Sequence, residues 1–162
     1  MNRRKLFFLI PLIATITVVI LGATKGHAAE EQFDVKITSP KDSSNAGREV
    51  VVRGTASIPS GHHLWVLARR KDFKPLWWPQ REAEIDPKTH EWEATAGLGG
   101  EQDIGWYFDI GVITVNANEH QKLMAYWEKA METGDWKPKK IPPTTSPPRT
   151  VKVKKVSHQA SQ

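Results

Sequence analysis

Short runs of alternating apolar and polar residues recur along this chain at roughly ten-residue intervals, with turn-forming residues between them, a spacing typical of all-β domains. In residues 33–38, the side chains of Phe33, Val35 and Ile37 fall on one face, which predicts a half-buried strand. Residues 49–54 repeat the alternation. The repeated pattern therefore predicts a β-rich domain built from short strands.

The following strands differ in how much of each is apolar. Residues 64–69 begin apolar on both faces, which is typical of a central strand. Residues 77–80 contain Pro79, and because proline is tolerated at sheet edges, we expect a short edge strand there. Residues 106–115 are rich in aromatic and β-branched side chains and predict the longest strand, and residues 150–156 predict the last one.

A β-hairpin is expected around the dipeptide Asp86-Pro87, because proline after aspartate favours a turn. Its arms are residues 83–85 and residues 91–96. In the second arm alternation turns Trp92 inward, so a buried hydrophobic face lies on this hairpin too.

One helix is predicted at residues 118–133, before the last strand. Asn116 and Glu119 have the spacing of a capping box, and Gly134 is a suitable C-cap. Apolar side chains recur at helical spacing on the face expected to dock on the sheet: Leu123, Met124, Trp127, Ala130 and Met131.

These elements predict a mainly β fold, an antiparallel β-sandwich with one α-helix inserted before the last strand. An up-and-down barrel is the alternative. The expected organisation is a body over residues 30–136, a proline-rich connection over residues 137–149, a last strand over residues 150–156 and a disordered tail over residues 157–162.

Residues 1–29 predict export from the cytoplasm. A positive start is followed by 17 uncharged, mostly apolar residues at 6–22, which is the pattern of a signal peptide. Cleavage would follow Ala28 or Ala29. The alternative is an uncleaved apolar helix that anchors the protein in the membrane through residues 6–24. Either way we expect a periplasmic or extracellular domain, and in the uncleaved case it is tethered to the cytoplasmic membrane.

Charge and cysteine content exclude several classes of function. The formal net charge is +5, but residues 30–136 carry 12 basic and 18 acidic side chains, whereas residues 137–162 carry seven basic and no acidic ones. An acidic body is poorly suited to nucleic acid, which requires a basic face. The absence of cysteine excludes disulfides, thiol catalysis and cysteine-ligated metals.

Two segments resemble a known module. Residues 37–42 (ITSPKD) followed by residues 50–55 (VVVRGT) are similar to the opening of bacterial extracellular immunoglobulin-like domains. The likeness continues through LWVL at 64–67, WWPQ at 77–80, Trp92, LG at 98–99 and FDI at 108–110. The resemblance implies an immunoglobulin-like sandwich and is almost silent on activity, because this fold hosts many functions.

Three tryptophans are the candidate ligand-binding residues. Trp77 and Trp78 are neighbours, and neighbouring strand residues face opposite ways, so one of them is expected at the surface. Trp106 and Tyr107 are likewise neighbours in a predicted strand, so one of these two rings is also expected at the surface. An exposed indole can stack on a sugar ring or anchor a protein partner.

Other candidate sites are weaker. His62 and His63 lack a third metal ligand at useful spacing, so we expect no metal site and no cofactor. The predicted hairpin is acidic, and it could serve a hydrolase only if two of its carboxylates faced one pocket. Its acidic residues are Glu82, Glu84, Asp86, Glu91 and Glu93. No hydrolase or phosphate-loop motif occurs. The chain is therefore expected to be no enzyme but an exported binding or structural module of the cell envelope, with an envelope protein as partner or, alternatively, a polysaccharide.

Overall fold

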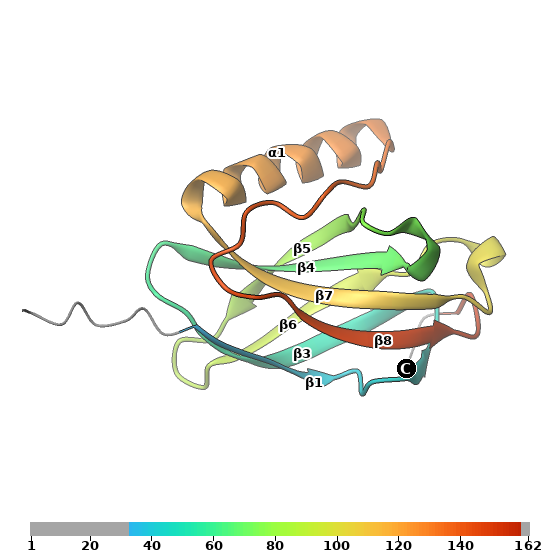
Figure 1. The fold of residues 1–162 in the computed structure, drawn as a ribbon, viewed down its shortest axis with the longest axis horizontal. Helices are drawn as coiled ribbons and strands as arrows, with labels where there is room; N and C mark the ends of the chain where they lie inside the picture. The colour runs from blue at the N-terminus through green and yellow to red at the C-terminus, as the bar shows by residue number, and fades with distance from the viewer. Residues whose placement is uncertain (1–32, 160–162) are drawn as a thin grey trace, which may run out of the picture. The chain divides into compact units, whose positions relative to one another are not determined.

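The computed structural model of this chain describes residues 33–159, which form one open, curled sheet of eight strands and one helix (Figure 1). The strand order is β1-β3-β6-β5-β4-β7-β8-β2, and all neighbours are antiparallel except β8 and β2. The predicted leader at residues 1–29 lies outside the described residues. The strands are β1 (Asp34–Ser39), β2 (Ser44–Ala46), β3 (Glu49–Ser57), β4 (His62–Arg70), β5 (Trp78–Ile85), β6 (Glu91–Gly97), β7 (Tyr107–Asn116) and β8 (Arg149–Lys155).

The main hydrophobic core lies inside the curl of the sheet. Alternate residues of β3 and β6, such as Val52 and Ala96, meet alternate residues of β4 and β7, such as Val66 and Ile110, in one buried cluster. The curl therefore gives the sheet two facing halves with an apolar layer between them, as in sandwich-like folds.

A second core covers the outer face of β4 and β7. Trp65 and Leu67 of β4 pack there with Ile113 and Val115 of β7, and helix α1 (Ala117–Thr133) closes the layer with Leu123 (Figure 1). Strand β4 is consequently buried on both faces, as its sequence predicts.

The helix ends where the sequence predicts and begins one residue earlier, at Ala117 instead of residue 118. The Asn116 side chain accepts a hydrogen bond from the Glu119 N–H, and Gly134 adopts the left-handed conformation at the C-cap. Leu123 and Ala130 are buried, while Met131 at the end of the predicted stripe is 58% exposed.

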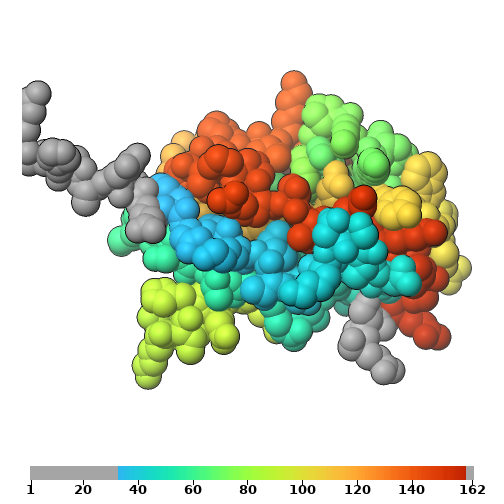
Figure 2. All heavy atoms as spheres, turned by 60° about the horizontal axis from the view of Figure 1, so that its bottom comes forward, coloured from blue at the N-terminus to red at the C-terminus, as the bar shows by residue number. Residues whose placement is uncertain are grey.

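The predicted hairpin is also confirmed. Asp86 accepts hydrogen bonds from the N–H groups of Lys88 and Thr89 at 2.7 and 3.0 Å, which closes the turn between β5 and β6. This turn stands out from the body (Figure 2). These bonds to the Asp86 carboxylate lower its pKa.

Residues 78–80 of the predicted edge strand belong to a longer strand than predicted, because β5 continues to Ile85 and lies between β6 and β4 in the sheet. Trp78 and Pro79 nevertheless pair with β4 alone, since the β5–β6 pairing covers only Glu84 and Ile85, so this end of β5 is an edge on its β6 side. Strand β2 is an element that the sequence did not predict, and it pairs with β8 beside it (Figure 2). The sheet is open within residues 33–159, with β1 and β2 at its edges, so the barrel alternative does not hold.

Lys155 ties the last strand to the loop after β6. Its side chain is buried, and its ammonium group donates hydrogen bonds to the carbonyl oxygens of Leu98, Gly99 and Gly100. Burial lowers the pKa of this lysine. Among residues 33–159, no helix is both long enough and apolar enough to cross a membrane.

Candidate functional site

A groove of about 980 Å³ opens where β5 joins the two halves of the sheet. Its lining combines apolar and polar side chains. The apolar lining includes Phe73, Trp78, Trp127, Met131 and Trp136, and the polar lining includes Arg48, Glu49, Arg70, Gln80, Arg81, Thr95, Gln102 and Asp103. This lining is more polar than that of a typical small-molecule pocket, where apolar side chains predominate.

The groove exists because β5 and β6 diverge. Their pairing includes Glu84 opposite Glu93 but does not continue towards Trp78. A β-bulge places Gln80 as an extra residue opposite β4, and a bulge bends its strand. Pro79 precedes the bulge, in a position where proline is tolerated.

The side chain of Gln80 bridges the diverging strands. Its Oε1 accepts the N–H of Gly97 at 2.8 Å, and its Nε2 donates to the carbonyl oxygen of Trp78 at 3.1 Å. A side-chain amide thus takes the place of main-chain pairing at this position.

The three predicted tryptophans have different environments. Trp77 is only 4% exposed, with the Arg69 guanidinium 4.0 Å above its ring and Gly111 against its edge, so it belongs to the second core and not to the groove. Trp78 is half-buried in the groove wall, where its Nε1 donates to the carbonyl oxygen of Trp136. The structure therefore separates the two neighbours as strand alternation requires.

Trp106 is 44% exposed and lies beyond the groove lining. The Arg70 guanidinium stands 4.5 Å from its ring and 4.8 Å from the ring of Phe73. Arg70 also pairs with Asp72 and Asp103 at 2.7 and 2.5 Å. The hydrogen bond to Arg70 lowers the pKa of Asp72, so this end of the groove holds a fixed ion-pair network.

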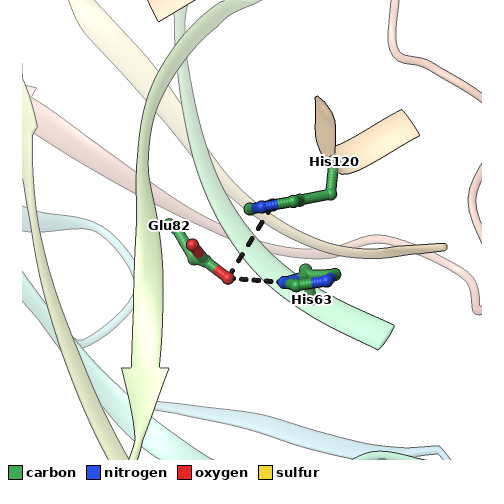
Figure 3. Close-up of side chains that lie close together, drawn as sticks. All are labelled: His63, Glu82 and His120. Atoms are coloured by element: carbon green, nitrogen blue, oxygen red, sulfur yellow. Dashed lines mark hydrogen bonds and ion pairs between the residues drawn. The ribbon is translucent and has the colours of Figure 1, made fainter. Parts of the chain in front are cut away.

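A second cluster lies near the start of α1. His63 of β4, Glu82 of β5 and His120 of α1 converge, and their ligand atoms lie within 4.8 Å of one another (Figure 3). Nδ1 of His63 lies 2.7 Å from Oε1 of Glu82, and Nδ1 of His120 lies 3.8 Å from the same oxygen. The two imidazole rings stack at 3.6 Å with 10° between their planes.

The environment of His120 keeps its imidazole neutral. Its Nδ1 accepts a hydrogen bond from the Nε1–H of Trp65 at 3.1 Å, which places the ring proton on Nε2. Burial lowers its pKa; the carboxylate of Glu82 opposes this effect and the charge of His63 adds to it.

Two histidines and a carboxylate are a donor set that zinc accepts, but the orientation of the rings is unfavourable. A metal binds an imidazole nitrogen in the plane of the ring, and these two planes are nearly parallel. In addition, Nδ1 of His120 already accepts a hydrogen bond from the indole N–H of Trp65. The cluster fits a proton held between His63 and Glu82 better than a shared metal ion.

Four of the five acidic residues of the hairpin line a second, smaller groove of about 580 Å³, together with Arg53: Glu84, Asp86, Glu91 and Glu93. The His62 ring packs edge-on against Phe33 at 5.0 Å. Glu84 and Asp86 are exposed, and Glu93 pairs with Arg53 at 2.6 Å on the surface. Glu82 is thus the carboxylate of the hairpin that joins the histidine cluster.

Sequence reasoning missed both the divergence of β5 and the third member of the histidine cluster. Pro79 was the available signal for an irregular strand. His120 had no such signal, because it is 57 residues from His63 along the chain and meets it only through the docking of α1.

No protein-family model matches this chain, and no curated protein matches it in sequence.

Proposed function

We propose that this chain is an exported, non-catalytic binding module of the cell envelope, with an immunoglobulin-like β-sandwich body, and that it binds a partner protein in the groove between β5 and β6. The single observation that supports this most is the groove itself. Its lining brings Trp78, Trp127 and Trp136 together with three arginines, and tryptophan and arginine are enriched at the energetic centres of protein interfaces.

Two acidic residues line the groove, Asp103 and Glu49. Among residues 33–159, Asp103 is held by Arg70 and by the Gly100 N–H, so it is poorly placed to act as a free acid or base. Glu49 is exposed and stands on β3.

In-cell photocrosslinking tests the proposal. A photoreactive benzoylphenylalanine replaces Thr95 in the groove, and in the control it replaces Lys88 in the exposed turn. We expect a protease-sensitive adduct from the Thr95 position and none from the Lys88 position. Equal crosslinking from both positions, or an adduct that resists protease, would contradict a protein partner in the groove.

A polysaccharide is the second candidate ligand. The observation that favours it is the exposure of the rings of Phe73, Trp106 and Trp136, at 38%, 44% and 39%. Exposed aromatic rings next to hydrogen-bonding groups can stack on sugars. Affinity electrophoresis through cell-wall polysaccharide tests this: retardation of the protein that is abolished by Trp106→Ala would favour it over a protein partner.

A further inference from the structure

The edge of β6 that faces the groove is open to another strand. In an antiparallel pair, main-chain groups point alternately towards one neighbour and the other. The Asp86 N–H donates to the Glu91 carbonyl oxygen, so the main-chain groups of Glu91 point towards β5. Thr95 and Gly97 are four and six residues further along β6, and their main-chain groups therefore point the same way. The β5–β6 pairing leaves Thr95 without a partner residue on β5.

At Gly97, the place of a pairing strand is taken by the side chain of Gln80, which another strand could displace. Continuing the β5–β6 register would set Gln80 opposite Gly97, and there the Gln80 side chain accepts the Gly97 N–H. A flexible amide can rotate away from this bond without breaking the sheet. Thr95 and Gly97 then offer main-chain groups at a spacing of roughly 6.8 Å, the two-residue repeat of an extended polypeptide.

The charges and apolar surfaces around this edge restrict what such a segment would carry. Arg48 and Arg81 line the groove and have no carboxylate within ion-pair distance among residues 33–159. The Arg81 guanidinium lies 5.6 Å from the Trp127 ring. The lining also contains two carboxylates, exposed Glu49 and Asp103, and Asp103 is already paired with Arg70, so positive charge remains in excess.

We infer that the partner binds as an extended, acidic polypeptide segment that adds a strand along β6, pairs with the main chain of Thr95 and Gly97, and displaces the side chain of Gln80. Strand addition gives affinity through the main chain and specificity through alternate side chains. One side chain would pack on Trp78 and Trp127, and an acidic one would pair with Arg81. This inference rests on the proposed function, since it specifies the occupant of the same groove.

Peptides selected from a random phage-displayed library on the purified full-length protein are the probe. In the complex with the tightest synthetic peptide, we expect slowed hydrogen exchange at the Thr95 and Gly97 amides. We also expect selection to enrich aspartate or glutamate. Thr95→Pro removes the N–H that faces β5, whereas Thr95→Val keeps it.

We expect Thr95→Pro to weaken peptide binding about tenfold, the equivalent of one main-chain hydrogen bond, and Thr95→Val, which keeps the N–H group, to weaken it less. Arg81→Gln should weaken binding of the acidic peptide, whereas Arg53→Gln, on the outer surface of β3, should not. Hydrogen exchange in the wild type keeps the test decisive if Thr95→Pro does not fold.

Two failures are distinguishable. If a selected peptide perturbs Trp78 and Trp127 but leaves the exchange of Thr95 and Gly97 unchanged, the groove binds polypeptide and strand addition is wrong. If no selected peptide perturbs a groove residue, while polysaccharide binding depends on Trp106, both the inference and the protein-binding proposal are overturned.

Discussion

The indole Nε1–H of Trp65 donates a hydrogen bond to Nδ1 of His120 across 3.1 Å, which links the centre of β4 to the first turns of α1. The bond requires an unprotonated Nδ1, because a protonated imidazole has no acceptor. The contact between the helix and the sheet is therefore coupled to the protonation of His120.

We expect the protein to lose stability as the pH falls below about 6.5, the ordinary pKa of histidine in an unfolded chain. Burial lowers the pKa of His120 in the folded protein, so the unfolded chain binds the proton more readily. This contribution to stability is complete above the unfolded pKa and is lost as the pH falls towards the lowered folded value. Urea unfolding at a series of pH values measures it.

His120→Asn is the matched control for that experiment. Its amide oxygen can accept the Trp65 proton but does not titrate in this range. We expect this variant to show a shallower fall in stability with falling pH. A fall as steep as that of the wild type would show that other groups cause the dependence.

Gly54→Ala should destabilise the protein severely. A Cβ at this position would lie 1.9 Å from the carbonyl oxygen of Lys36 and 2.6 Å from the ring of Trp92, and the main-chain oxygen cannot rotate away. We expect a loss of about 3 kcal/mol in the free energy of unfolding, as for severe overpacking. Gly97→Ala is the control, because its Cβ would meet only the Gln80 side chain, at 3.5 Å. Equal losses in both variants would contradict the steric explanation.

Replacing Lys155 should loosen the loop after β6. Lys155→Met keeps most of the aliphatic chain but leaves the carbonyl oxygens of residues 98–100 without their donor, at a cost of about 2–3 kcal/mol. Lys154→Met is the control, because the Lys154 ammonium lies over the Tyr107 ring at 5.7 Å rather than against carbonyl groups. Chemical unfolding compares the two variants, and a larger loss in Lys154→Met would argue against this role for Lys155.

Helix docking is expected to depend on Leu123 far more than on Met131. Leu123 is 5% exposed within the second core, whereas Met131 is 58% exposed. Leu123→Ala should lower the free energy of unfolding by about 2–3 kcal/mol, and Met131→Ala by less than about 0.5 kcal/mol. Thermal or urea unfolding measures both, and comparable losses would mean that the helix packs differently.

Much of the fold could be predicted because its signals are local. The N-cap bond from the Glu119 N–H to Asn116, the turn at Asp86 and the alternation of β3 depend on residues a few positions apart. Strand β2 could not be predicted, because its three residues have no apolar alternation and form a strand only by pairing with β8.

The candidate site was less predictable because it depends on tertiary contacts. The sequence marked Trp77 and Trp78 as a pair with opposite orientations, but it could not say that Arg69 and Gly111 would enclose Trp77. The groove arises where β5 diverges from β6 beside the bulge at Gln80. Pro79 signals an irregular strand, but it does not say which residue bulges or which neighbouring strand separates from β5.

The parallel pairing of β2 with β8 has a mechanical consequence. Ser44–Ala46 lie near the start of the described chain and pair with residues 153–155 near its end, with flanking bonds from Ser43 to Lys152 and from Val156 to Ala46. Opposite pulls on the two ends would slide these parallel strands past each other and load all their hydrogen bonds at once. We therefore expect the domain to resist stretching between its ends, and pulling single molecules should show a rupture force that falls when Ala46→Pro removes one of the strand's main-chain N–H groups.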